Sequence, residues 1–328
     1  MTPAVSVIVL NFNGRRWLEP CLTALAGQIG APPFEILLAD NGSQDGSIAM
    51  VADRFPAVRI VDNHRNIGYA EGNNRATRAA RGPVLAFLNN DTIPDPHWLA
   101  ALHAAHARAS PQTVVTSRIV VLDRPQIVDS AGDGYLRAGG AFKRGHGRPA
   151  VDFLESQEVF GACGAAFMVS RAFFDRLGGF DDRFFMVYED VDLSYRARLA
   201  GGRCFYVADA VVRHAGSGTL GVASDVAVFH GQRNLEGTWI TNTPAGLLLK
   251  TLPAHVVYSL AGLVHYARIG RLGAAVRGKL DALRGLPRVL AQRREMQRRF
   301  RGDAAAIEPW LERDWLAVKR EEKSARSS

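Results

Sequence analysis

The 328-residue chain contains only three cysteines, and its first residues do not form a signal sequence. Cys21, Cys163 and Cys204 lie far apart, without the paired spacing of a zinc site or the even number of a disulfide framework. We therefore expect three ordinary buried thiols. Residues 1–4 lead directly into an apolar strand-like segment, without a basic region or a small-residue cleavage site. This pattern predicts that the active domain faces the cytoplasm.

Most of the chain carries almost no excess charge of either sign. The net positive charge is concentrated at its end. Residues 1–240 hold 23 Lys and Arg against 24 Asp and Glu, whereas residues 241–328 hold 17 against 8. We therefore predict a nearly neutral domain at 1–240 and a basic helical extension at 241–328. Such an extension favours an anionic partner, either membrane phospholipid or nucleic acid. No nucleic acid partner is expected, because no recognised binding module is present and few aromatic residues accompany the arginines.

Short apolar runs alternate with helix-like segments through the first ninety residues. Residues 5–10 form a near-continuous β-branched run, and similar runs at 34–39, 58–61 and 84–88 also end in polar turns. Between them, apolar residues follow helical spacing. The alternation predicts an α/β fold in which helices cover both faces of a doubly wound, mostly parallel sheet.

The polar residues that end these strands are the first functional signal. Ligands of such sheets bind outside the carboxyl ends of the strands, so Asn11, Asp40 and Asp91 should line one crevice. A carboxylate at the position of Asp91 suits Mg²⁺ or Mn²⁺, which also bind phosphate oxygens. A helix cap explains Asp91 equally well, although Asp95 is the better cap for a helix that starts near residue 96.

Glu189, Asp190 and His214 also have two possible interpretations each. The two acids open a predicted helix over 189–200, where carboxylates serve as caps and complement the helix dipole. The apolar stretch at 184–188 that precedes them instead favours a raised pKa and a general base. His214 follows strand-like segments at 204–207 and 211–212 and is either a packed side chain or a metal ligand.

The remaining segments are less regular. We predict a long loop over the Gly-rich residues 129–151 and expect acceptor-side loops in the surrounding region. Residues 216–221 have the letters of a dinucleotide fingerprint but not its βαβ setting, so we expect a mobile loop. Residues 251–267 lack Asp, Glu, Lys and Arg and predict an interfacial helix. A basic amphipathic surface helix is predicted farther on, from Arg293, Arg294, Arg298, Arg299 and Arg301 interleaved with Leu290, Met296 and Phe300.

Five segments, in this order, resemble the motifs of the inverting family 2 glycosyltransferases of the GT-A fold, in particular the rhamnosyltransferase-like branch. They are VSVIVLNFNG at 5–14, DNGSQDGS at 40–47, NIGYAEGNN at 66–74, LNNDT at 88–92 and GGFDDRFFMVYEDVDLSYR at 178–196. The resemblance spans about residues 4–240. It implies a catalytic domain over 1–240, with a nucleotide-binding half at 1–110 and an acceptor-binding, catalytic half at 111–240.

The resemblance also implies where the nucleotide would bind. Asp40 would hydrogen-bond the nucleobase, with Asn11 and Asn13 near the nucleotide. Asn66 and Asn73 would shape the same pocket.

The implied metal site and base lie at the other motifs. The DxD motif of the family corresponds to Asn89, Asn90 and Asp91, so Asn89 replaces the first acid and Asp91 keeps the carboxylate for Mg²⁺ or Mn²⁺. His214 would complete the metal coordination. Asp190 matches the base that activates the acceptor, with Glu189 as its neighbour.

These roles imply a metal-dependent enzyme of cell-envelope polysaccharide synthesis. It would transfer a sugar, with rhamnose as one candidate, from a nucleoside-diphosphate sugar to a hydroxyl of a glycan or polyprenyl-linked acceptor. UDP or dTDP is expected as the nucleotide rather than GDP. The basic extension would dock on the inner face of the cell membrane, where lipid-borne acceptors lie.

Two other functions remain open. A pyrophosphorylase-like nucleotidyltransferase needs a basic phosphate-binding loop near the first strand, for which only Arg15 and Arg16 are candidates. A non-catalytic nucleotide-sugar-binding protein would not need Asp190.

Overall fold

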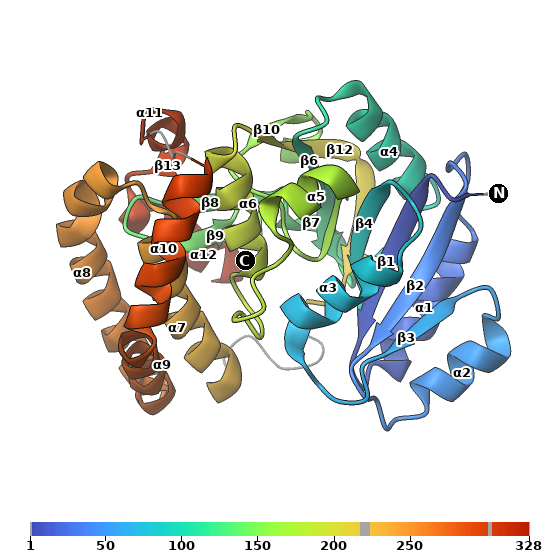
Figure 1. Cartoon of the computed structure of the whole chain (residues 1–328), viewed down its shortest axis with the longest axis horizontal. Helices are drawn as coiled ribbons and strands as arrows, with labels where there is room; N and C mark the ends of the chain where they lie inside the picture. Colours follow the sequence, from blue (N-terminus) through green and yellow to red (C-terminus); the bar gives the residue numbers. More distant parts are fainter. Residues whose placement is uncertain (1, 217–223, 301–303, 328) are drawn as a thin grey trace.

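A ten-stranded sheet forms the centre of the chain, whose computed structural model describes residues 2–216, 224–300 and 304–327 (Figure 1). Its strands are β1 Val5–Asn11, β2 Phe34–Asp40, β3 Arg59–Asp62, β4 Val84–Asn89, β5 Thr92–Pro94, β6 Thr113–Val121, β7 Arg124–Ser130, β10 Gln157–Val159, β11 Ala166–Ser170 and β12 Arg203–His214. Eight follow in the order β10-β12-β6-β11-β4-β1-β2-β3, while β5 pairs with β12 and β7 with β6. Six of these eight run in one direction, because only β10 and β11 are antiparallel to their neighbours. The predicted mostly parallel sheet is confirmed.

Helices cover both faces of this sheet, as predicted. They are α1 Arg15–Ala26, α2 Ser47–Arg54, α3 Gly68–Ala79, α4 Trp98–Arg108, α5 Arg171–Leu177 and α6 Glu189–Leu199. Leu18 of α1, Val51 of α2 and Trp98 of α4 belong to one apolar core. Ala76 of α3 and Tyr195 of α6 belong to the core on the opposite face. Burial of these stripes against the sheet supplies the main driving force for the fold.

The predicted loop over residues 129–151 is wrong. The segment forms β8 Asp133–Leu136, β9 Ala141–Lys143 and a 3₁₀ turn at Ala150–Phe153. β8 pairs with β9 and, on its other side, with β13 Leu311–Glu312 from the far end of the chain. The glycines of this segment weaken any local strand pattern, and the partner strand is distant in sequence. No local pattern could therefore predict the small sheet.

Three smaller expectations have clear outcomes. The strand-like segments at 204–207 and 211–212 are one strand, β12, whose register with β6 shifts between Val207 and Val211. Asp95 does not cap α4, because the helix starts after His97 without a side-chain cap, and Asp95 Oδ1 instead accepts from Arg213 at 3.1 Å. The three cysteines are buried as predicted. The mobile loop expected at 216–221 lies, from residue 217, outside the described residues.

The C-terminal extension is helical, as predicted. α7 Asp225–Asn242 leads into it, and it contains α8 Ala245–Arg268, α9 Leu272–Arg284, α10 Leu286–Phe300, α11 Ala304–Ile307, a 3₁₀ turn at Glu308–Trp310, and α12 Trp315–Ser327. Figure 1 shows α7 to α10 gathered on one side of the sheet domain. The predicted boundary at residue 240 falls within α7. Because α7 also contacts α6, the extension is continuous with the sheet domain.

α10 packs on the protein instead of presenting a free amphipathic face. Its apolar residues Met296 and Phe300 are buried in the core that contains α6. Arg293 donates to the carbonyls of Ile240 and Thr243, and Arg299 donates to that of Arg176. The predicted surface role of this helix is therefore wrong for the face that carries Met296 and Phe300. Arg301 lies outside the described residues.

Candidate active site

The ends of β1, β2 and β4 meet through a network of buried amides. Asn11 Nδ2 donates to Asp40 Oδ1 at 2.8 Å, and Asn90 Nδ2 donates to Asn11 Oδ1 at 2.7 Å. The pairing of Asn11 with Asp40 in adjacent parallel strands places them side by side. A Cβ at Gly14 would lie 2.0 Å from Asn90 Nδ2, so a larger residue at 14 would displace that amide. The structure thus brings together three of the predicted residues.

Asp40 is fully buried and its carboxylate is occupied. Oδ2 accepts from Ser43 N at 2.7 Å, and Oδ1 accepts from the Ser43 hydroxyl at 2.6 Å as well as from Asn11. In this conformation Asp40 holds the turn after β2 and offers no exposed oxygen. Asn13, by contrast, is exposed, with a φ of +50° and Oδ1 accepting from Gln44 N.

Asn66 and Asn73 lie at opposite extremes of exposure near α3. Asn66 is exposed, and its Oδ1 accepts from Gly68 N at the start of the helix. Asn73 is 1% exposed and donates to Tyr69 O one turn earlier. Only Asn66 therefore offers an accessible amide.

Asp91, His214 and Asp129 form a buried chain of polar contacts. β5 pairs antiparallel with the end of β12, which sets His214 opposite Thr92 and beside Asp91. His214 Nε2 lies 3.3 Å from Asp91 Oδ1, while His214 Nδ1 lies 2.8 Å from Asp129 Oδ2. Burial alone would lower the pKa of His214, but the two carboxylates outweigh it and raise the pKa to about 9.

Asp129 was not predicted. It also accepts from Lys143 Nζ at 2.8 Å, and its backbone carbonyl lies 2.9 Å from His146 Nδ1. Burial would raise the pKa of Asp129, but Lys143 and the two histidines hold it well below the usual range. The only sequence feature that points to Asp129 is the pair of acids at 129 and 133 within the segment expected to be a loop.

Glu189 and Asp190 open α6 behind a turn of three residues, 163–165. Asp190 Oδ2 accepts from Gly164 N at 2.6 Å, and Oδ1 accepts from Val191 N at 2.8 Å. A Cβ at Gly164 would lie 2.8 Å from Asp190 Oδ2, so glycine is needed for this approach. Burial raises the pKa of Asp190, partly offset by the two N–H donors. Burial and the charge of Asp190 raise the pKa of Glu189 well above its usual value.

Asp133 and Cys163 complete the surroundings of Asp190. Among the described residues, ligand atoms of Asp133, Cys163 and Asp190 lie within 4.8 Å of one another. Asp133 Oδ1 is buried without a hydrogen-bond partner. Burial, followed by the charge of Asp190, raises the pKa of Asp133 well above its usual value, and burial does the same for the thiol. Burial and the charge of Asp190 thus favour the protonated form of Asp133, whereas the N–H groups of Gly164 and Val191 favour the ionised form of Asp190.

The same turn connects the two halves of the site. Asn89 N, at the end of β4, donates to Ala165 O at 2.9 Å, one residue from the amide that holds Asp190. Tyr69 hydroxyl donates to Gly164 O at 2.7 Å and fixes the turn from the side of α3. The strand end that leads to Asp91 and the carboxylate of Asp190 therefore flank one short turn.

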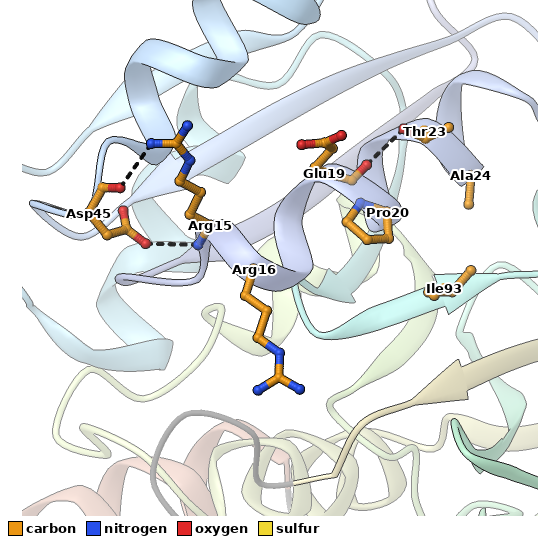
Figure 2. A pocket seen from close by; sticks show the side chains of 8 residues that line it. All are labelled: Arg15, Arg16, Glu19, Pro20, Thr23, Ala24, Asp45 and Ile93. Atoms are coloured by element: carbon orange, nitrogen blue, oxygen red, sulfur yellow. Dashed lines mark hydrogen bonds between the residues drawn. The ribbon is translucent and has the colours of Figure 1, made fainter.

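A shallow hollow on α1 contains none of the predicted site residues. It is lined by Arg15, Arg16, Glu19, Pro20, Thr23, Ala24, Asp45 and Ile93. Figure 2 shows Arg15 turned toward Asp45, which accepts from Arg15 N at 2.8 Å, while Arg16 points away from both. The Arg16 guanidinium lies 4.4 Å from the ring centroid of Trp17. Neither arginine forms the convergent phosphate loop that a nucleotidyltransferase would need.

The sequence matches the family model described as glycosyl transferase family 2 over residues 6–178, slightly more than half of the chain. The chain belongs to this family. An N-acetylglucosaminyl-diphospho-decaprenol L-rhamnosyltransferase of Mycobacterium tuberculosis is 30% identical over 256 residues, covering 70% of this chain and 82% of that protein. The resemblance to family 2 glycosyltransferases, including a rhamnosyltransferase, is confirmed.

Solved structures share the fold of this glycosyltransferase. A mannosyltransferase from Pyrobaculum calidifontis, in complex with GDP-Man and Mn²⁺, has a TM-score of 0.52 at 20% identity, covering 94% of this chain and 88% of that one. GalNAc-T7 with UDP, GalNAc and Mn²⁺ has a TM-score of 0.56 at 17% identity and covers 72% of this chain. This chain spans 48% of that structure. At these identities the likeness shows the GT-A fold alone.

The residues of this glycosyltransferase fit a divalent cation at Asp91 and His214. One carboxylate oxygen and one imidazole nitrogen converge there, a donor set that suits Mn²⁺. The second imidazole nitrogen already contacts Asp129, the usual arrangement behind a metal-bound histidine. Asp133 and Cys163 fit less well, because burial favours their neutral forms and hard cations prefer charged oxygen ligands.

Proposed function

We propose that this glycosyltransferase is a metal-dependent, inverting enzyme that uses a nucleoside-diphosphate sugar and a lipid-linked saccharide acceptor. One observation carries the proposal. Gly164 N donates to Asp190, and the next residue of the same short turn, Ala165, accepts from Asn89 N. Asn89 ends the strand that leads to Asp91, which contacts His214. A base for the acceptor and a cation site for the donor are both needed for single displacement.

The donor would bind along the ends of β1, β2 and β4. Asp91 and His214 would hold the cation, which neutralises the leaving diphosphate when bound. Asn13 and Asn66 are exposed enough to contact the nucleotide. We assign the buried Asn11, Asn73 and Asn90 to the wall of this pocket, and Asp40 to the turn that carries Ser43. Direct contact of Asp40 with the nucleobase stays a prediction, and it requires Ser43 to turn away.

Asp190 would act on the acceptor. The acceptor hydroxyl oxygen attacks the anomeric carbon while its proton passes to a carboxylate oxygen of Asp190. The bond from the anomeric carbon to the diphosphate oxygen breaks, and its electron pair leaves with the nucleoside diphosphate. Attack opposite the leaving group inverts the anomeric configuration. Burial raises the pKa of Asp190, which strengthens it as a base.

The acceptor class rests on a relative and on the surface of the extension. The mycobacterial relative is named for a decaprenyl-linked acceptor and for rhamnose transfer. We therefore propose rhamnose, carried by dTDP or UDP, and a polyprenyl-linked acceptor of cell-envelope synthesis. Such an acceptor keeps its lipid in the bilayer, so the enzyme must approach the cytoplasmic membrane surface.

The exposed apolar face of α8, together with exposed apolar side chains of α9 and of the turn between the two helices, supports that approach. It is an exposed set of large aliphatic side chains: Leu249, Leu252, Val256, Val257, Leu260, Val264, Ile269, Leu272, Val276, Leu280 and Leu283. α8 is the one helix of the described residues that is long and apolar enough to cross a membrane. Leu247, Thr251 and His255 are nevertheless buried at four-residue spacing, so one stripe of α8 packs on the protein. We therefore propose that this face lies in the membrane interface, with Lys250 and Arg268 near anionic headgroups.

Turnover tests the proposed activity. Purified protein with Mn²⁺, a panel of UDP-, dTDP- and GDP-sugars and a polyprenyl-diphosphate saccharide should release nucleoside diphosphate and form a new glycosidic bond. NMR of the product should show an anomeric configuration opposite to that of the donor. Release of pyrophosphate would instead support a nucleotidyltransferase, and donor binding without turnover would support a binding protein.

Vesicle flotation tests the proposed membrane surface. Wild-type protein should float with vesicles that contain anionic phospholipid, and the double variant Val257→Glu/Leu260→Glu should stay behind. Leu154→Glu is a matched control, because Leu154 is 58% exposed but lies outside the extension. Equal flotation of the double variant and wild type would contradict the assignment.

A further inference from the structure

The segment that delivers Glu189 and Asp190 has an unusual backbone. Val187 and Tyr188, directly before the two acids, have φ of +66° and +79°. Only Asn13 and His64 share a positive φ among the described non-glycine residues. This conformation is costly for a β-branched residue such as Val187, and it persists only where neighbouring contacts impose it.

Three consecutive carbonyls of this segment accept hydrogen bonds from other elements. Phe185 O accepts from Tyr69 N of α3 at 2.6 Å. Met186 O and Val187 O both accept from Asn234 Nδ2 of α7, at 2.9 and 2.7 Å. The single amide of Asn234 therefore holds the carbonyl groups of the two peptide bonds that flank Val187.

Asn234 is well suited to this task. Its side chain is fully buried, and its Oδ1 accepts from Arg233 Nε at 2.9 Å, which fixes the amide orientation so that Nδ2 faces the segment. Arg233 in turn donates to Arg183 O, four residues before Val187. Val187 itself is 37% exposed, so packing of its own side chain contributes little to its conformation.

We propose that Asn234 is a positioning residue that imposes the backbone at Val187 and Tyr188 and thereby directs Asp190 to Gly164. This inference rests on the proposed function of Asp190 as the base. Among the described residues, the side-chain hydrogen bonds of Asn234 reach only the segment before the acids and the neighbouring Arg233. Loss of Asn234 should therefore misplace the base and leave the donor site at Asp91 and His214 intact. α7, which spans the predicted domain boundary at residue 240, thus contributes to the alignment of the catalytic acids.

The first test separates catalysis from donor binding. In Asn234→Ala, kcat should fall about 100-fold, the effect of a misplacement of roughly 1 Å. The Kd for the nucleoside diphosphate with Mn²⁺, measured by calorimetry, should stay within about twofold of wild type. This is well below the tenfold change in Kd that corresponds to about 1.4 kcal/mol of binding free energy. Asn242→Ala is the matched control: Asn242 is a fully buried asparagine of the same helix whose amide donates to Asp192. It should lower Tm similarly and keep kcat close to wild type.

The second test uses strain relief as a rescue. Glycine adopts positive φ without steric cost, so Val187→Gly needs no contact to impose the turn. The double variant Val187→Gly/Asn234→Ala should regain about tenfold in kcat over Asn234→Ala, although it lacks the same amide. A role in stability alone predicts no such gain, and its absence would overturn the proposal.

A third measurement does not depend on activity. Hydrogen exchange of the amides of Gly164 and Val191, which donate to Asp190, should speed up in Asn234→Ala and slow again in the double variant. Unchanged exchange in Asn234→Ala would refute the positioning role even if the enzyme were inactive. If exchange responds as expected but Asp190→Asn remains fully active, the proposed function of Asp190 fails and the positioning of Asp190 by Asn234 stands.

Discussion

Asp190 and Asp91, the two acids at the centre of the site, lie in contrasting surroundings. Asp190 is held by the neutral N–H groups of Gly164 and Val191 and is surrounded by buried groups with raised pKa values. Asp91 lies at the end of an ionic chain through His214 and Asp129 to Lys143. The first setting suits proton transfer, because desolvation makes a carboxylate more basic. The second suits a cation and a diphosphate, whose charges need charged partners.

Gly164→Ala should give the largest difference between the two regions, because it should affect kcat and leave donor binding intact. The new Cβ would lie 2.8 Å from Asp190 Oδ2, so the carboxylate or the turn must move. We expect kcat to fall about 100- to 1,000-fold, comparable to the loss of one preorganised contact in an active site. Donor binding, measured by calorimetry, should change little. Gly27→Ala, whose Cβ would have no neighbour within 3.4 Å, is the control, and equal losses in both variants would refute the explanation.

A smaller effect is expected at the other region from Asp129→Asn. The substitution weakens the partner that orients His214, and changes of this kind cost about 10- to 100-fold in metal affinity. Mn²⁺ titration in the presence of nucleoside diphosphate should show the loss, and kcat at saturating Mn²⁺ should recover. The control Asp123→Asn, which changes an exposed acid in the connection between β6 and β7, should bind like wild type. Unchanged Mn²⁺ affinity in Asp129→Asn would show that His214, which Asp129 orients, does not bind the cation.

The smallest effect on activity is expected from Asp133→Asn, because asparagine resembles the protonated acid. Activity at neutral pH should stay within about tenfold of wild type, less than 1.4 kcal/mol. Stability should change in a defined direction. The pKa of Asp133 is raised in the folded protein, so its contribution is complete below the unfolded pKa of about 4 and is lost as pH rises.

The melting temperature provides the check on Asp133. Asp133→Asn should match wild type near pH 4 and exceed it increasingly at higher pH, measured by thermal shift across a pH series. A variant that is less stable than wild type at pH 8 would show that Asp133 is ionised in the folded protein.

The sequence predicts the parts of the fold that follow from patterns of residues close together in the chain. The runs at 5–10 and 34–39 become parallel strands that pair one βα repeat apart, and the run at 84–88 has the same apolar pattern and joins β1 on its other edge. The positions of Asn11 and Asp91 after strand ends follow from the same repeat, and the position of Asp190 follows from the helix predicted over 189–200. Residues 129–143 could not be predicted in this way, since β8 pairs with a strand at Leu311 and Asp129 pairs with His214. Those partners are close only after the whole chain has folded.

Burial was the other property that the sequence did not reveal. Asp40 and Asn73 match positions associated with nucleotide binding, yet both are buried and hydrogen-bonded to their own surroundings. Asn234 is missing from the predicted site because it lies in α7, near the predicted domain boundary. Its proposed role depends on the positive φ of Val187, which no residue pattern in the sequence predicts.

The most direct test of the central claim is the kcat of Asp190→Asn under conditions where its donor binding is measured on the same sample. We predict that this variant binds nucleoside diphosphate and Mn²⁺ with wild-type affinity while kcat falls at least about 100-fold, the lower end of what a general base contributes. Wild-type kcat in Asp190→Asn would show that Asp190 is not the base.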